Sequence, residues 1–148
     1  MYKNILVATD GSRLSTKAIK AACQIASAVG AKVTGFYARP AFSASIYPEG
    51  GAFGTIIGKA RFEKHTKEQA DDVLEQVRKE AKKAGVETAL VSEASGQPYK
   101  AIIKAAKTAR CDLIVMASHG RRGLAGLLIG SETQKVLTHS AIPVLVIR

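Results

Sequence analysis

Small and hydroxyl-bearing residues near the end of the chain have the types and spacing of a phosphate-binding loop. The stretch Ala117-Ser118-His119-Gly120 follows the apolar run 112–116, and Gly130-Ser131 comes after nine further residues. Small residues let backbone N–H groups approach an anion. The helix that we predict from Ser131 adds unpaired N–H donors and the positive end of its dipole. The chemistry this stretch could perform is therefore the binding of a phosphate.

A carboxylate stands at a corresponding place early in the chain. The turn Thr9-Asp10-Gly11-Ser12 follows the first apolar run. In doubly wound sheets, ligands lie at the carboxyl ends of strands where the strand order reverses. If the first and fourth strands are neighbours, Asp10 and Gly120 face one crevice, where the carboxylate can accept hydrogen bonds from ribose hydroxyls. A structural explanation stays open, because Asp and Ser are common helix caps and Ser12 stands at a predicted helix start.

Two further residues of the loop allow alternative interpretations. Ser131 and Gln134 have the spacing of a capping box, so they could simply start a helix, although the N–H groups of a capped start remain available to an anion. His119 could act as an acid or base near neutral pH. No nucleophile or second base stands at a supporting spacing, so we predict no catalytic residue and, at most, slow ATP hydrolysis.

Five apolar, β-branched runs alternate with helical patterns along the chain. The runs predict strands at 3–8, 32–38, 86–92, 112–117 and 143–147, and the patterns predict helices at 12–29, 60–84, 98–110 and 131–138. Runs that are apolar without alternation suit parallel strands covered on both faces. The β-α-β-α order with right-handed crossovers therefore predicts a doubly wound α/β sheet.

One irregular segment interrupts this order, at residues 39–59, which contain two prolines and four glycines. A segment of this length is usually a functional lid or a mobile loop. It could cover a ligand, meet a partner chain, or simply rest on the surface.

Length and composition fit one domain, residues 1–148. No apolar run approaches the roughly 20 residues of a membrane span. The first residues do not form a secretion signal, so we expect a cytoplasmic protein without membrane contact.

The net charge of +10 is dispersed and aromatic residues make up only 5%, without Trp, which weighs against nucleic-acid binding. Cys23 and Cys111 are isolated, so we predict neither a metal site nor a disulfide. The chain also lacks the glycine patterns of P-loop NTPases and dinucleotide dehydrogenases.

The loop and its surroundings together resemble the universal stress protein family. Its nucleotide-binding members carry Gly-x2-Gly-x9-Gly-Ser/Thr, which this sequence matches at Gly120, Gly130 and Ser131, with Ala117 in place of the first glycine. Three further stretches resemble the family: residues 3–12, 96–98 and 143–147. The resemblance implies an open five-stranded parallel sheet of order 3-2-1-4-5, of the adenine nucleotide alpha-hydrolase-like kind. It also implies a homodimer formed through the last strand, with Val144, Leu145, Val146 and Ile147.

The resemblance further implies a regulatory stress-response protein that binds ATP or AMP, with Mg²⁺ or Mn²⁺, in the crevice between the first and fourth strands. Ala8 and Ala38 would wall the adenine, and Asp10 would meet the ribose or adenine side. Met116 and Ala117 would lie along the ribose, and the matched loop residues would bind the phosphates. The nucleotide-binding set is Ala8, Thr9, Asp10, Ala38, Met116, Ala117, His119, Gly120, Gly130, Ser131 and Glu132.

Two other functions remain open at this point. Ala117 favours a signalling dimer of the same fold with an empty site, because a methyl group clashes if this position needs positive φ or close ligand approach. The other is a slow ATPase or phosphotransferase that works through His119.

Overall fold

The computed structural model describes residues 1–43, 51–120 and 129–148. Strands and helices alternate along these residues. The strands are β1 (Asn4–Ala8), β2 (Lys32–Arg39), β3 (Thr88–Ala94), β4 (Leu113–Ala117) and β5 (Val144–Ile147). The helices are α1 (Arg13–Val29), α2 (Gly51–Lys83), α3 (Pro98–Thr108) and α4 (Ser131–His139).

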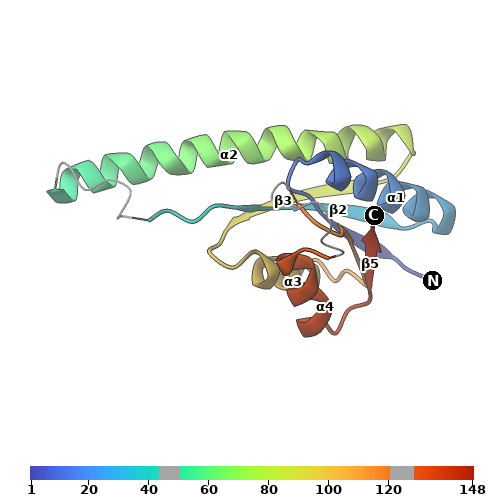
Figure 1. Cartoon of the computed structure of the whole chain (residues 1–148). Helices are drawn as coiled ribbons and strands as arrows, with labels where there is room; N and C mark the ends of the chain where they lie inside the picture. Colours follow the sequence, from blue (N-terminus) through green and yellow to red (C-terminus); the bar gives the residue numbers. More distant parts are fainter. Residues whose placement is uncertain (44–50, 121–128) are drawn as a thin grey trace.

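All strand pairs are parallel, and the sheet has the order β3-β2-β1-β4-β5, which confirms the predicted fold. Helices α1 and α2 cover one face of the sheet, and α3 and α4 cover the other (Figure 1). The strands divide their side chains between two cores: Ile5 and Val7 face α1 and α2, whereas Leu6 faces α3. Burial on both faces explains the absence of alternation in these strands.

Helix α2 lies very close to the sheet because position 35 carries no side chain. A Cβ at Gly35 would lie 2.9 Å from Cγ1 of Val77 on α2 and 3.0 Å from Cδ2 of Leu90 on β3. Such distances are shorter than carbon atoms tolerate, since the optimum is about 3.5–4.0 Å. A glycine in the middle of β2 therefore sets the distance between the helix and the sheet.

Helix α2 begins earlier than the sequence suggested. Residues 51–59 are helical, so the prediction that they belong to an irregular segment was wrong. Glycine lowers helix stability by about 1 kcal/mol relative to alanine. These residues nevertheless extend a helix that is already nucleated, so they avoid the main cost of helix formation. The remainder of the expected loop at 44–50 lies outside the described residues.

The other end of α2 is closed by a glycine turn, which moves the start of the next strand. Gly85 has a φ of +66°, and the amide of Val86 donates to the carbonyl of Ala81 at 2.9 Å. This bond is the long one of a Schellman turn. Because Val86 closes the helix, β3 begins at Thr88, two residues later than predicted.

Within the described part of the chain, no helix combines the length and apolar character needed to cross a membrane.

Candidate functional site

A cavity of about 650 Å³ lies at the carboxyl ends of β1, β2 and β4, where the starts of α3 and α4 also converge. All eleven residues of the predicted nucleotide-binding set line it: Ala8, Thr9, Asp10, Ala38, Met116, Ala117, His119, Gly120, Gly130, Ser131 and Glu132. The topology explains this meeting, because β1 lies between β2 and β4 and the strands are parallel. Their role as ligand contacts stays a prediction.

The cavity also has lining residues that sequence reasoning missed: Ser15, Phe36, Tyr37, Pro40, Pro98, Ile102 and Thr133. Phe36 and Tyr37 immediately precede Ala38 on β2, so the expected strand order could have pointed to them. Ile102 gave no such signal, because its helical spacing indicates only a core position.

Ser12, rather than Asp10, caps α1. The Ser12 hydroxyl accepts from the Ser15 amide at 3.1 Å, and Oδ1 of Asp10 accepts from the Ser12 amide at 3.0 Å. The carboxylate therefore holds the turn in front of the helix. A Cβ at Gly120 would collide with Oδ2 of Asp10. Asp10 and Gly120 thus face one crevice, as predicted.

Gly130 lies against the backbone at the start of the same loop. Its amide donates to the carbonyl of Ser118 at 2.6 Å. A Cβ at Gly130 would lie 3.1 Å from the Cα of His119 and 3.3 Å from the Ser118 oxygen. Because these atoms belong largely to the main chain, they cannot turn aside as a flexible side chain would. The absence of a side chain at Gly130 therefore lets the two ends of the loop meet.

Ser131 begins α4, but it and Gln134 do not form the capping box that their spacing allows. The N-cap of α4 is Gly130, no side chain caps it, and the Gln134 amide donates to the Gly130 carbonyl at 2.9 Å. Thr133 fixes the helix start instead, since its hydroxyl donates to the Ala117 carbonyl at 2.9 Å. First-turn N–H groups have no acceptor within their own helix, so this start can receive an anion.

Ala117 fits its place in β4 without backbone strain. Among the described non-glycine residues, positive φ occurs at Arg110, and Ala117 lies in the extended strand. The backbone at this position therefore does not need a glycine to avoid strain. The effect of the methyl group depends on how closely a ligand approaches.

His119 has a modest polar environment. Its Nδ1 lies 3.2 Å from the Ser118 hydroxyl, and the residue is half-buried at the cavity wall. Among the described residues, no group of three or more His, Cys, Asp or Glu side chains is arranged to hold a metal ion.

A second hollow, of about 480 Å³, lies between α3 and α4 and shares none of the eleven predicted residues. Its lining is Tyr99, Lys100, Ile103, Lys104, Lys107, Thr108 and His139. The ammonium group of Lys104 lies 2.7 Å from the carboxylate of Glu93. Three lysines, Lys100, Lys104 and Lys107, make this hollow basic.

Comparison with known proteins agrees with the geometry. The model of the universal stress protein family matches residues 1–148. The chain is similar to Universal stress protein MJ0531 of Methanocaldococcus jannaschii, with 32% identity over all of this chain and 83% of that protein. The solved structure of MJ0577, from the same organism, superposes with a TM-score of 0.80 at 27% identity, covering 99% and 96% of the two chains. A universal stress protein solved in complex with cAMP superposes with a TM-score of 0.72 at 25% identity, covering 99% and 97%.

Proposed function

The chain belongs to the universal stress protein family, and we propose that it is a regulatory protein that binds an adenine nucleotide, ATP or AMP, in this cavity. The observation that carries the proposal is that two glycines lie where a side chain would meet neighbouring atoms. Side chains at Gly120 and Gly130 would strike Asp10 and the loop backbone. Both glycines line the cavity beside the start of α4, where an anion can be held. The similar protein solved with cAMP supports the choice of an adenine nucleotide.

The cavity offers a distinct surface for each part of the nucleotide. Ala8, Ala38 and Met116 give an apolar wall for the base and the ribose. The carboxylate of Asp10 accepts hydrogen bonds from the ribose hydroxyls. Gly120 and Ser131 meet the phosphates through backbone N–H groups. Gly130, whose own N–H donates to the Ser118 carbonyl, adds no side chain beside them. Mg²⁺ or Mn²⁺ accompanies a triphosphate.

The proposal is tested by the effect of nucleotide on the melting temperature. A ligand present at about ten times its Kd stabilises the folded state by about 1.4 kcal/mol. For a chain of this size, that raises the melting temperature by about 3–5 °C. We expect this rise with millimolar AMP and with millimolar ATP plus Mg²⁺. No nucleotide-dependent rise would contradict the proposal.

A matched pair of glycine variants locates the effect. Gly130→Ala must push the His119 backbone away, so we expect its nucleotide affinity to fall about tenfold. Gly96→Ala is the control, because nothing lies within 4 Å of its Cβ and its φ is not positive. Equal affinities in the two variants would exclude the loop as the binding site.

A further inference from the structure

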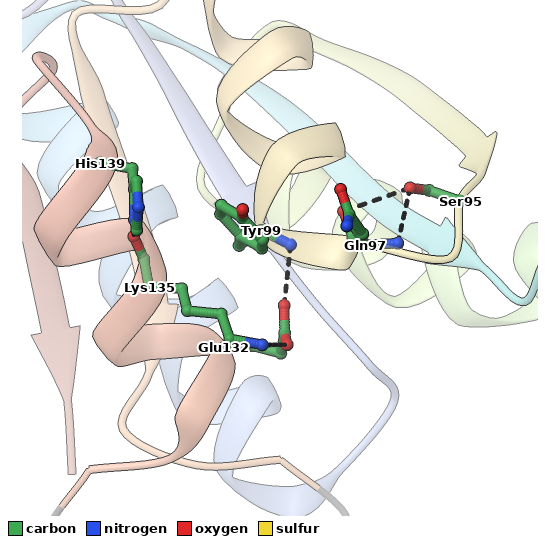
Figure 2. A network of polar contacts seen from close by, with 6 residues as sticks. All are labelled: Ser95, Gln97, Tyr99, Glu132, Lys135 and His139. Carbon is green, nitrogen blue, oxygen red and sulfur yellow. Dashed lines mark hydrogen bonds and ion pairs between the residues drawn. The ribbon is translucent and has the colours of Figure 1, made fainter.

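We propose that Glu132 makes this cavity select adenine nucleotides by phosphate charge, favouring a monophosphate over a triphosphate without metal. The inference rests on the proposed function, because it concerns the phosphate end of the same cavity. Its basis is the carboxylate of Glu132, which comes from α4 and closes the start of α3 (Figure 2).

Helix α3 does not cap itself. Its N-cap residue, Gln97, makes no hydrogen bond from its side chain to the helix start, and Pro98 has no amide hydrogen. The hydroxyl of Ser95 is used in the preceding turn, where it accepts from the Gln97 amide at 3.0 Å and donates to the Gln97 carbonyl at 3.2 Å. The first amide of α3 that needs an acceptor is therefore that of Tyr99.

Glu132 supplies this acceptor from the neighbouring helix. Its Oε2 accepts from the Tyr99 amide at 2.8 Å, and its Oε1 lies 3.1 Å from Nζ of Lys135 (Figure 2). A carboxylate at a helix start is favourable, because the start carries a partial positive charge of about half a unit. The carboxylate of Glu132 thus places one negative charge beside the starts of both α3 and α4.

This charge lies at the phosphate end of the cavity. Glu132 and Pro98 line the cavity together with Gly130 and Ser131. Two helix starts would otherwise present positive potential there. The carboxylate offsets that potential. The side chains of Lys135 and Glu132 are 48% and 35% exposed, so water screens both charges, the lysine's more than the carboxylate's.

The consequence differs among nucleotides. A phosphate monoester carries about two negative charges near neutral pH, and a triphosphate carries more. Repulsion from Glu132 therefore rises with the number of phosphates. A divalent cation bound to the triphosphate cancels much of that charge, so the selection applies to metal-free ATP.

The test is the affinity of purified Glu132→Gln for three ligands, measured by calorimetry: AMP, ATP with a chelator, and ATP with Mg²⁺. Glutamine keeps an oxygen that can accept from Tyr99 but removes the charge. We expect metal-free ATP to bind about threefold tighter or more, and AMP and Mg²⁺-ATP to change less. Glu63→Gln, which removes a carboxylate from an exposed ion pair on α2, should leave all three affinities unchanged.

The possible failures are distinguishable. If Glu132→Gln changes the affinities for AMP and metal-free ATP by the same factor, the charge selection is wrong and the proposed function stands. If neither wild type nor variant binds any adenine nucleotide, both proposals fall. A lower melting temperature in Glu132→Ala than in Glu132→Gln would support the hydrogen bond to Tyr99. Equal melting temperatures would contradict that part of the proposal.

Discussion

At the scale of single residues, Gly120 and Gly130 are glycine for reasons of space. Gly130 has an extended backbone with φ of −72°, and Gly120 is not among the glycines with positive φ. Each is instead approached by atoms that a Cβ would displace: the Asp10 carboxylate at Gly120 and the His119 backbone at Gly130. The spacing of the motif identifies such glycines in the sequence. It does not indicate which neighbouring atom lies where their side chain would be.

The two thiols of the chain are buried in opposite cores, Cys23 under α1 and α2 and Cys111 under α3. Burial, with a smaller contribution from Glu80, raises the pKa of the Cys23 thiol from 9.0 to about 11. Burial also raises the pKa of the Cys111 thiol. Because the thiolate is the reactive form, both cysteines should be inert near neutral pH.

We therefore predict that iodoacetamide labels neither cysteine of the folded protein at pH 8 on the timescale on which the unfolded chain is labelled completely. A rise of two pKa units leaves roughly a hundredfold less thiolate at Cys23, and burial slows access further. Mass spectrometry of quenched samples measures both rates, with guanidinium-unfolded protein as the control. Fast labelling of the native chain would show that the helices open readily over these positions.

The lining residues show what the sequence could and could not predict. Asp10, Gly120 and Gly130 belong to recognisable strand-end motifs, so their meeting followed from the expected strand order. The contact of Glu132 with Tyr99 could not be predicted, because it depends on the distance between two helices that are far apart in the sequence. The spacing of Ser131 and Gln134 fits a capping box, but Gly130 already takes the cap position, which the sequence did not indicate.

At the scale of elements, α2 consists of two halves with different surroundings. The half from Ala70 to Ala81 contributes to the core between α2 and the sheet, whereas the first turns project beyond the sheet (Figure 1). Ile56 and Ile57 on these turns are 65% and 41% exposed. Nearby, Phe62 contacts Phe42 edge to face, with ring centroids 5.6 Å apart. Among the described residues, the first turns of α2 therefore bury less apolar surface than the half from Ala70 to Ala81.

Hydrogen exchange should separate the two halves. We predict that amides at 54–62 exchange at least tenfold faster than those at 70–81, because local opening exposes less buried apolar surface there. Mass spectrometry of peptides from the two halves measures this difference. Equal protection along the whole helix would mean that a further surface covers its first turns in solution.

The misplaced start of α2 has a physical cause. The glycines at 51, 54 and 58 are typical of loops and therefore predicted an irregular segment. Helix formation is cooperative, so a stable helix from Ala60 onward can be extended through residues that would not start one. Local composition therefore placed the boundary nine residues too late.

At the scale of the whole molecule, the sheet has two open edges, β3 and β5. An open edge presents unpaired backbone groups that can pair with another chain. Leu145 on β5 is 36% exposed and Val91 on β3 is 37% exposed, so the two edges offer similar apolar side chains. We propose that the chain forms a homodimer through β5, as the family resemblance implies.

A pair of charge-introducing variants tests this arrangement. We predict that Leu145→Arg weakens dimerisation at least tenfold, because it brings two like charges into the interface. Val91→Arg, at an equally exposed position on the opposite edge, should leave the dimer intact. Sedimentation velocity across a range of concentrations measures both. A dimer disrupted by Val91→Arg alone would place the interface on β3, and a monomeric wild type would exclude a dimer.

The most direct test of the central proposal is an NMR titration of the isotope-labelled protein with AMP. Saturable shifts of the backbone amides of Asp10, Gly120, Gly130 and Ser131 are the predicted result, because these residues line the cavity where the nucleotide should bind. The amides of Lys104 and Lys107, in the basic hollow between α3 and α4, should move little. The proposal would be contradicted if the strand-end amides did not shift, or if shifts appeared only in the basic hollow.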